Sequence, residues 1–185
     1  MRTLLSDKAI SYLGVNLRSG WIEETFGLEG GAIVAWSGPC HVRTEDLVDL
    51  EDVAAGAEIH AALMLHFLAE HPEDDLLVTV CRQRLLVAEA LEILRELAPA
   101  APLARSGDDL YCGSRKLSVS IATRSPRSGL IHFGVNVDPT GAPVPAVGLA
   151  ELGVNPAEFA RRLLAAYAEE MTGIERAWHK VREVA

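Results

Sequence analysis

The chain has 185 residues, of which 49% are hydrophobic, and a formal net charge of -9 at pH 7. This size and apolar content suit one compact domain spanning residues 1–185, which needs neither disulfides nor metals in order to fold. The acidic balance argues against a nucleic-acid partner, because affinity for phosphate backbones comes largely from clustered lysine and arginine.

The three cysteines, Cys40, Cys81 and Cys112, show no CxxC spacing, so the sequence predicts neither a disulfide framework nor a thiolate zinc site. Residues 1–10 lack the apolar core of a signal peptide, and no apolar run approaches the roughly 18 residues that a membrane span needs. We therefore expect a soluble, cytoplasmic protein with no membrane partner.

Apolar patterns in the N-terminal half predict several elements. Alternation favours a strand over residues 11–17, and a short apolar run after a Gly-Gly turn favours another over residues 31–36. Residues 53–70 carry Ile59, Leu63, Met64 and Phe67 at helical spacing, which predicts a helix of about four turns. Residues 76–81 are expected to form a strand, and residues 85–97 a helix.

The C-terminal half begins with a connection over residues 99–106 that contains one short edge strand. A period-two pattern then runs from residue 109 to residue 137, and a proline-rich loop covers residues 137–147. The sequence from Asn155 to Glu158 combines an N-cap, a proline at the first helical position and a capping-box glutamate. It predicts a helix that Gly173 ends, followed by a last helix over residues 174–182. The pattern as a whole favours an α+β fold with helices against a mostly antiparallel sheet.

Two strands of the period-two region are polar on one face, and a turn at residues 123–129 predicts that they pair as a hairpin. A register that matches apolar with apolar residues sets Lys116 opposite Asn136 if the loop has three residues, or opposite Asp138 if it has five. In either register a lysine, two hydroxyls, an imidazole and an amide share one surface. The residues of this face are Lys116, Ser118, Ser120, His132, Gly134 and Asn136.

Such a polar face is also what the solvent side of a half-buried sheet presents. A solvated face, however, usually carries long charged side chains. The small residues Ser118, Ser120 and Gly134 instead leave room for a ligand to lie across the strands.

The string GDDLYCGSRKLSVSIAT, followed by GLIHFGVNV, resembles the substrate-binding hairpin of the biotin and lipoate protein ligases. In that family an Asn-Asp-Leu or Asn-Asp-Ile segment precedes a Lys-Leu or Lys-Ile strand and a returning strand rich in glycine and histidine. The resemblance implies that Lys116 contacts an acyl carboxyl group and an adenylate phosphate, and that Asp109 is the aspartate of the motif. Asp108 stands where those ligases have asparagine.

A second part of the ligase pattern is missing from the sequence. Lipoate ligases have an Arg-Arg-Ser-Gly-Gly-Gly segment and biotin ligases a Gly-Arg-Gly-rich loop, whereas residues 27–31 here favour a hairpin turn over a phosphate cradle. ATP and Mg²⁺ are therefore cofactors that the resemblance implies without the loop that would hold the phosphates.

Over nearly its whole length the chain is also similar to an uncharacterised family, domain of unknown function 366. The similarity covers the Gly-Pro-Cys stretch at residues 38–40, the Asp-Leu-Glu-Asp stretch at 49–52, the Gln-Arg-Leu stretch at 83–85 and the hairpin. That family is grouped with the biotin and lipoate ligases and the class II aminoacyl-tRNA synthetases. The similarity implies the biotin/lipoate ligase-like fold.

Other residues allow two interpretations each. Gln83 and Arg84 follow a predicted strand at a helix start, where they could meet an anion or simply face solvent. Asp49 and Asp52 belong to an acidic group that could bind Mg²⁺, although acidic residues before a helix also stabilise its N-terminus, which we favour. A zinc site is not predicted, because His60 and His66 are six residues apart and so do not share a face of the expected helix, and His132 is the only histidine with polar neighbours.

Two functional hypotheses follow. The first is an acyl-adenylate-type ligase or acyltransferase acting on a small carboxylic acid, with Lys116 and Asp109 as catalytic residues. The second is a non-catalytic domain that kept the fold and binds a small carboxylate or nucleotide. The residues expected to shape the pocket are Asp108, Ser118, Ser120, His132, Gly134, Asn136, Gln83 and Arg84. A homodimer through an edge strand or the C-terminal helices is a further expectation.

Overall fold

The computed structural model describes residues 1–73 and 75–184. Its main feature is a five-stranded sheet with the order β1-β2-β3-β8-β7. The strands are β1 (Arg2–Leu5), β2 (Ala32–Val42), β3 (Ile59–His71), β7 (Ser118–Arg124) and β8 (Gly129–Asp138). Only the β1–β2 pair is parallel among these neighbours, so the sheet is mostly antiparallel, as the sequence indicates.

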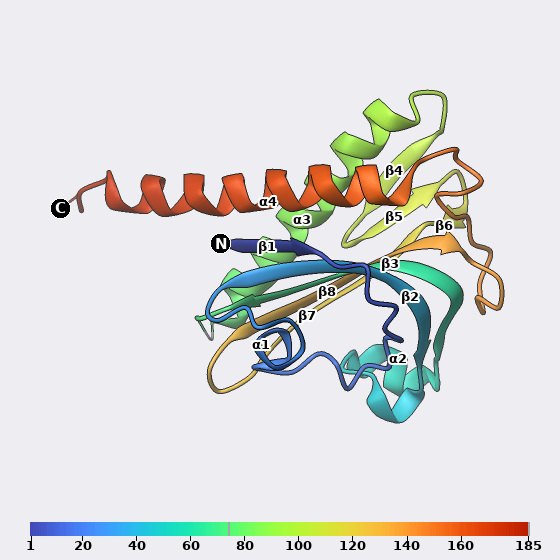
Figure 1. The fold of residues 1–185 in the computed structure, drawn as a ribbon, viewed down its shortest axis with the longest axis horizontal. Coiled ribbons are helices and arrows are strands. Elements are labelled where there is room, and N and C mark those ends of the chain that lie inside the picture. The colour runs from blue at the N-terminus through green and yellow to red at the C-terminus, as the bar shows by residue number, and fades with distance from the viewer. Residues whose placement is uncertain (74, 185) are drawn as a thin grey trace.

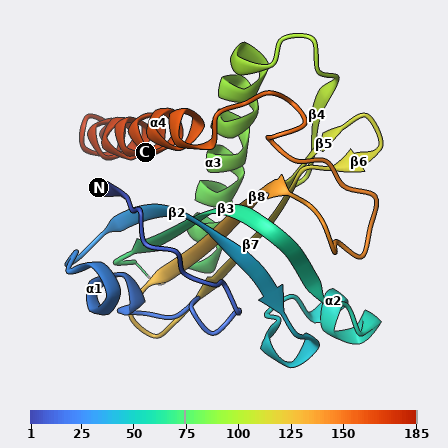
Figure 2. The ribbon, with the colours of Figure 1, turned by 45° about the vertical axis from the view of Figure 1, so that its right-hand side comes forward.

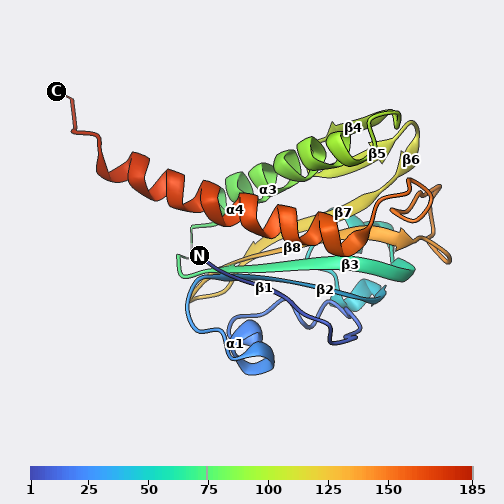
Figure 3. The same ribbon diagram turned by 45° about the horizontal axis from the view of Figure 1, so that its top comes forward.

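Different parts of the chain cover the two faces of this sheet. Helices α3 (Leu76–Leu97) and α4 (Pro156–His179) pack on one face, and the N-terminal segment with the short helix α1 (Trp21–Phe26) packs on the other (Figures 1 and 3). Both faces of β2 and β3 are therefore buried. The C-terminal part of α4 extends beyond the sheet, as Figure 1 shows. Within the described residues, no helix combines the length and hydropathy needed to cross a membrane.

A second sheet of three short strands lies beside α3 (Figure 2). Its strands are β4 (Leu103–Ser106), β5 (Asp109–Cys112) and β6 (Arg115–Lys116). At Leu117 the chain leaves this sheet and enters β7 of the large one. The turn η1 (Thr44–Asp46) and helix α2 (Leu50–Ala55) form the connection between β2 and β3.

The predicted helix over residues 53–70 is wrong, because this segment ends α2 and then forms most of β3. Strand β3 is central in the sheet and buried from Met64 to Ala69. A strand that is covered on both faces shows an almost continuous apolar run, which periodicity cannot distinguish from a buried helix. The predicted strand over residues 76–81 is also wrong, since Asp75 accepts a hydrogen bond from Val78 N and begins α3 there.

Three further expectations differ from the structure. Residues 11–17 form no strand, and only Tyr12 makes an isolated bridge, with Cys40. Residues 27–31 connect α1 to β2 instead of forming a hairpin turn. Gly173 does not end α4, because its backbone stays helical and the helix continues to His179. The expected strand at residues 31–36, the helix over 85–97, the edge strand within residues 99–106 and the Asn155 cap are confirmed.

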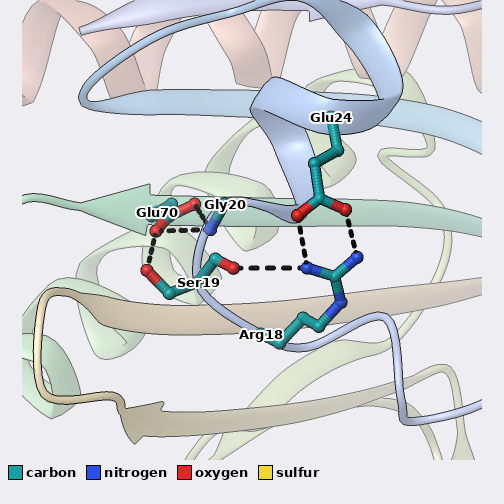
Figure 4. A network of polar contacts seen from close by, with 5 residues as sticks. All are labelled: Arg18, Ser19, Gly20, Glu24 and Glu70. Carbon is teal, nitrogen blue, oxygen red and sulfur yellow. Dashed lines mark hydrogen bonds and ion pairs between the residues drawn. The ribbon is translucent and has the colours of Figure 1, made fainter.

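The end of β3 is tied to two loops through the carboxylate of Glu70. The hydroxyls of Ser19 and Ser128 each donate to Glu70 Oε1 at 2.8 Å, and the backbone N–H of Gly20 lies 3.0 Å from both carboxylate oxygens. Figure 4 shows Glu70 with Ser19 and Gly20, next to the exposed ion pair between Arg18 and Glu24, whose arginine also donates to the carbonyl oxygen of Ser19. The carboxylate thereby fixes the N-terminal segment and the β7–β8 turn to the central strand.

Replacing Glu70 with glutamine is expected to lower the free energy of unfolding by about 2 kcal/mol, because hydrogen bonds to a charged acceptor are stronger than those to an amide. Urea unfolding followed by tryptophan fluorescence measures this change. Glu24→Gln is the matched control, since the Arg18–Glu24 pair is exposed to solvent and surface pairs contribute little. Equal losses in the two variants would show that the Glu70 network does not anchor the loops.

Candidate functional site

A cavity of about 620 Å³ lies over the sheet face that α3 and α4 leave free. Tyr12 and Met64, which belong to the apolar cluster on that face, line it together with His132 of β8. Lys116 and helix α2 form further parts of the wall. The volume is in the range of small-molecule sites in proteins, and the walls combine apolar and polar side chains as such sites do.

Lys116 is held in the cavity wall by an ion pair with Asp109. The distance from Lys116 Nζ to Asp109 Oδ2 is 2.7 Å, and both side chains are partly buried. Burial raises the pKa of Asp109, and the negative charges of Asp108 and Asp52 act in the same direction. Burial alone would lower the pKa of Lys116, but its hydrogen bond and charge pairing with Asp109 outweigh burial and raise that pKa. The lysine is therefore cationic over the physiological pH range.

The predicted register of the hairpin is wrong by one residue. Val119 pairs with Gly134 and Ile121 with His132, so apolar side chains of β7 lie beside polar residues of β8. Ser118 and Ser120 point to the helix side, where Ser118 Oγ accepts a hydrogen bond from Leu110 N at 2.8 Å. Ser120 Oγ accepts a hydrogen bond from Gln83 Nε2 of α3 at 2.8 Å. Both hydroxyls therefore have partners on the helix side of the sheet, so the polar positions of β7 do not have to share a face with those of β8.

Lys116 is the last residue of β6 and Ser118 the first of β7, so the regular alternation of side chains is interrupted at Leu117. Lys116 therefore reaches the cavity although Ser118 does not. Lys116 pairs with Tyr111 of β5, not with Asn136 or Asp138 as either predicted register requires. Asn136 nevertheless stays close, because its Nδ2 donates to the carbonyl of Lys116 at 3.3 Å. Lys116, Asp109, Ser120, His132 and Asn136 thus border one cavity, whereas Ser118 and Gly134 are not among its described lining residues.

Gln83 and Arg84 lie inside α3 and support the turn before β5. Gln83 Nε2 donates to Asp108 Oδ2 at 2.9 Å and to Ser120 Oγ at 2.8 Å. Arg84 lies 3.4 Å from the other oxygen of Asp108. Asp108, the residue that replaces the asparagine of the ligase motif, is therefore held by side chains of a helix, and it also lines the cavity. Gln83 and Arg84 are not among the described lining residues.

His132, which lines the floor of the cavity, forms a pair with a second buried histidine, His66. His66 Nδ1 lies 3.1 Å from His132 Nε2, and the other ring nitrogen of His66 lies 3.1 Å from the carbonyl oxygen of Gly38. The ring of Tyr12 stacks on that of His132 with a centroid distance of 3.6 Å. Burial lowers the pKa of His66 to about 4, and burial and the charge of His66 lower that of His132, so both rings are neutral at pH 7.

Tyr12 and His66 were missed by the sequence prediction for different reasons. Tyr12 lies in a loop, where no local pattern marks a side chain that will cover a distant strand. His66 was assigned to a helix, so its place beside His132 on neighbouring strands could not be seen. The pairing of β3 with β8, which sets Leu68 and not His66 opposite His132, follows only from the sheet order.

The acidic group before α2 has two roles in the structure. Asp49 caps the helix and accepts a hydrogen bond from Glu51 N at 2.8 Å, as favoured from the sequence. Asp49 and Asp52 also line the cavity. Among the residues that the structure describes, no three His, Cys, Asp or Glu side chains come together as a metal site.

Two proteins share substantial sequence identity with this chain. An uncharacterised protein of Methanocaldococcus jannaschii, MJ0805, is 36% identical over 174 residues, which cover 90% of this chain and 78% of that protein. A solved structure of a protein of unknown function from Pyrococcus horikoshi has 39% identity and a TM-score of 0.94, and the match covers 100% of this chain and 99% of the other.

More distant structures have the same fold. The biotin protein ligase of Aquifex aeolicus in complex with biotin and ATP is similar with a TM-score of 0.58 and 16% identity, over 92% of this chain and 70% of the ligase. The putative lipoate protein ligase Ta0514 of T. acidophilum has a TM-score of 0.58 and 14% identity, over 92% and 85% of the two chains. The fold is thus that of biotin and lipoate protein ligases, as the hairpin motif implies.

The sequence also matches one protein family along residues 1–182, which is almost the complete chain. This extent agrees with the stretches at residues 38–40, 49–52 and 83–85 and with the hairpin, all of which lie inside the match. The chain therefore belongs to the family described as Domain of unknown function (DUF366).

Proposed function

We propose that the cavity binds a small carboxylic acid at Lys116. The observation that carries this proposal is the position of the lysine, the one Lys or Arg side chain among the described residues that line the cavity. Its ammonium group has three N–H donors, and Asp109 takes one of them at 2.7 Å. The remaining donors can meet a ligand carboxylate in a partly buried setting, where such charge-assisted hydrogen bonds are strong.

An acyl-adenylate-type ligase or acyltransferase would use the same acid together with ATP and Mg²⁺. The donor set of the cavity fits these cofactors poorly, because six carboxylates and a single lysine line it, whereas a triphosphate needs several cationic or backbone N–H donors. The described part of the chain also lacks a cluster of metal ligands. The fold shared with ligases favours the catalytic version, and the charges favour an acid-binding domain without nucleotide activation.

Calorimetric titration separates the two versions. The probes are biotin, lipoate, straight-chain acids of four to eight carbons and the amine-terminated acids of the same lengths, each with and without ATP and Mg²⁺. The ligase version requires that ATP binds and that it strengthens binding of one acid. The binding-domain version requires that an acid binds equally well without nucleotide. Failure of every acid to bind at millimolar concentration would contradict both versions.

Replacing Lys116 with methionine is expected to weaken binding of the tightest acid at least about tenfold, because a charge-assisted hydrogen bond contributes roughly 1.5–3 kcal/mol. Calorimetry measures the loss, and Lys116→Arg should retain part of the affinity. Arg115→Met is the matched control, since Arg115 is the neighbouring cation and pairs with Glu151 at the surface. Undiminished affinity in the folded Lys116→Met protein would show that the lysine is only structural.

A further inference from the structure

The charges in the cavity wall are strongly unbalanced. Its six carboxylates are Asp46, Asp49, Asp52, Glu58, Asp108 and Asp109. Three of them have cationic partners, namely Arg43 for Asp46, Arg84 for Asp108 and Lys116 for Asp109. For Asp49, Asp52 and Glu58 the described chain contains no ion-pair partner. A concave site with walls of one sign concentrates ions of the opposite sign.

Helix α2 brings part of this charge close to the lysine. Asp52, which is partly buried, raises the pKa of both Asp109 and Lys116 through its negative charge. An acid that binds at Lys116 therefore also meets the field of Asp52. A ligand with only a carboxylate is repelled by this field, whereas a ligand with an additional positive charge is attracted by it.

The floor of the cavity selects hydrogen-bond donors independently of charge. The carbonyl oxygen of Gly38 can only accept, so the His66 nitrogen that faces it carries the proton. The other nitrogen of the neutral His66 ring must then accept, and His132 Nε2 is the donor in the pair. His132 Nδ1 is left as a bare acceptor. His132 is 3% exposed, and within the described residues its ring is hydrogen-bonded to His66 alone, through Nε2.

Asn136 contributes a second acceptor of the same kind. Its Nδ2 donates to the carbonyl of Lys116, so Oδ1 is the remaining polar atom of the amide. Asn136 is 7% exposed, and within the described residues its side chain makes only the hydrogen bond to the carbonyl of Lys116. Both residues line the cavity, where these two acceptors can meet N–H or O–H donors of a ligand.

We propose that the ligand is an amine-bearing carboxylic acid, with its carboxylate at Lys116 and a cationic N–H donor group among the carboxylates and the floor acceptors. The proposal rests on the proposed function for the carboxylate half only. The cationic group of the ligand is supported by Asp49, Asp52 and Glu58, the lining carboxylates without an ion-pair partner in the described chain, and by the free acceptors of His132 and Asn136. Biotin and lipoate lack this cation, so the charges here favour a different acid.

The test compares four straight-chain probes of equal length by calorimetry, over lengths of four to eight carbons. They are the amine-terminated acid, the plain acid, the plain alkylamine and the acid with a trimethylammonium end. The amine-terminated acid of the best length is expected to bind at least tenfold more tightly than the plain acid. The trimethylammonium acid keeps the charge but has no N–H donor, and it is expected to bind more weakly than the amine.

Two variants test whether the cationic group of the ligand lies near Asp52. Asp52→Asn is expected to weaken binding of the amine-terminated acid about tenfold and to leave binding of the plain acid unchanged or stronger. Glu51→Gln is the matched control, because Glu51 lies next in α2 and is not among the described residues that line the cavity. It removes the same charge and should change neither affinity.

The possible failures are distinguishable. If the plain acid binds as tightly as the amine-terminated acid, the inference is overturned while the proposed function stands. If the alkylamine binds as tightly as the amine-terminated acid, the cationic site stands and the carboxylate role of Lys116 is overturned. If no probe of any length binds at 10 mM, both are overturned.

Discussion

Lowering the pH from 7.5 to 5 is expected to reduce the free energy of unfolding by about 4 kcal/mol through His66 and His71 alone. Burial lowers the pKa of His66 to about 4, and burial and the charge of Arg82 lower that of His71 to about 3. Both start from an ordinary value of about 6.5 in the unfolded chain. The lowered pKa of the buried His132 acts in the same direction.

The sign of the effect follows from which state binds the proton. Below pH 6.5 the unfolded chain takes up protons on these histidines, whereas the folded protein keeps them neutral down to about pH 4 for His66 and about pH 3 for His71. The stabilisation is complete above pH 6.5 and is lost as the pH falls through this window. At pH 5 each histidine accounts for about 2 kcal/mol, since one pKa unit corresponds to about 1.36 kcal/mol.

Urea unfolding at half-unit pH steps between 7.5 and 5 measures the dependence. His71→Phe is expected to make it shallower by about one proton, because Phe cannot take up a proton in the unfolded chain. Tyr167→Phe is the control, since it removes the 2.9 Å hydrogen bond to His71 but leaves the histidine buried. The raised pKa of Glu89, about 7, acts in the opposite direction over this range, so the variant decides the outcome. A pH dependence that His71→Phe leaves unchanged would contradict a neutral, buried His71.

The fold was predictable wherever one face of an element is polar or its ends are marked. Helix α4 begins at Asn155 as predicted, because the cap, the following proline and Glu158 form a local signal. The central strand β3 was predicted as a helix instead, because burial on both faces removes the alternation that identifies a strand. The class of the fold survived this error because the ligase-like hairpin implies the same architecture.

Part of the site was also predictable from the sequence. Lys116, Asp109, His132 and Asn136 border one cavity although the predicted register is off by one residue. Family resemblance pointed to Lys116 and Asp109. Strand periodicity pointed to His132 and Asn136, but it also placed Ser118 on the same face, which is wrong. Tyr12 and the contribution of Asp52 depend on how distant segments pack on the sheet. No local pattern in the sequence contains that information.

Replacing Gly38 with alanine is expected to lower the free energy of unfolding by about 3 kcal/mol or more. A Cβ at this position would lie 2.0 Å from the carbonyl oxygen of Ile10 and 2.9 Å from its carbonyl carbon. Both are backbone atoms, so the N-terminal segment has to move away from β2. Overpacking of this kind typically costs about 1–3 kcal/mol, and lost hydrogen bonds add to that cost.

The displaced segment carries contacts that matter for the cavity. Ile10 O accepts a hydrogen bond from Trp36 Nε1 at 2.8 Å, and Tyr12 N donates to the carbonyl of Pro39 at 2.9 Å. Both bonds hold Tyr12 over His132. The Gly38→Ala protein should therefore show altered tryptophan fluorescence and weaker ligand binding in addition to reduced stability.

Urea unfolding with tryptophan fluorescence measures the stability change, and Gly173→Ala is the matched control. A Cβ at Gly173 would have no atom within 4 Å outside its own helix, so this substitution should maintain the free energy of unfolding or raise it by about 0.5–1 kcal/mol. A Gly38→Ala protein as stable as the wild type would mean that the N-terminal segment is not packed against β2 at residue 38. In that case Tyr12 would not be fixed over the floor of the cavity, and its part in the site would be lost.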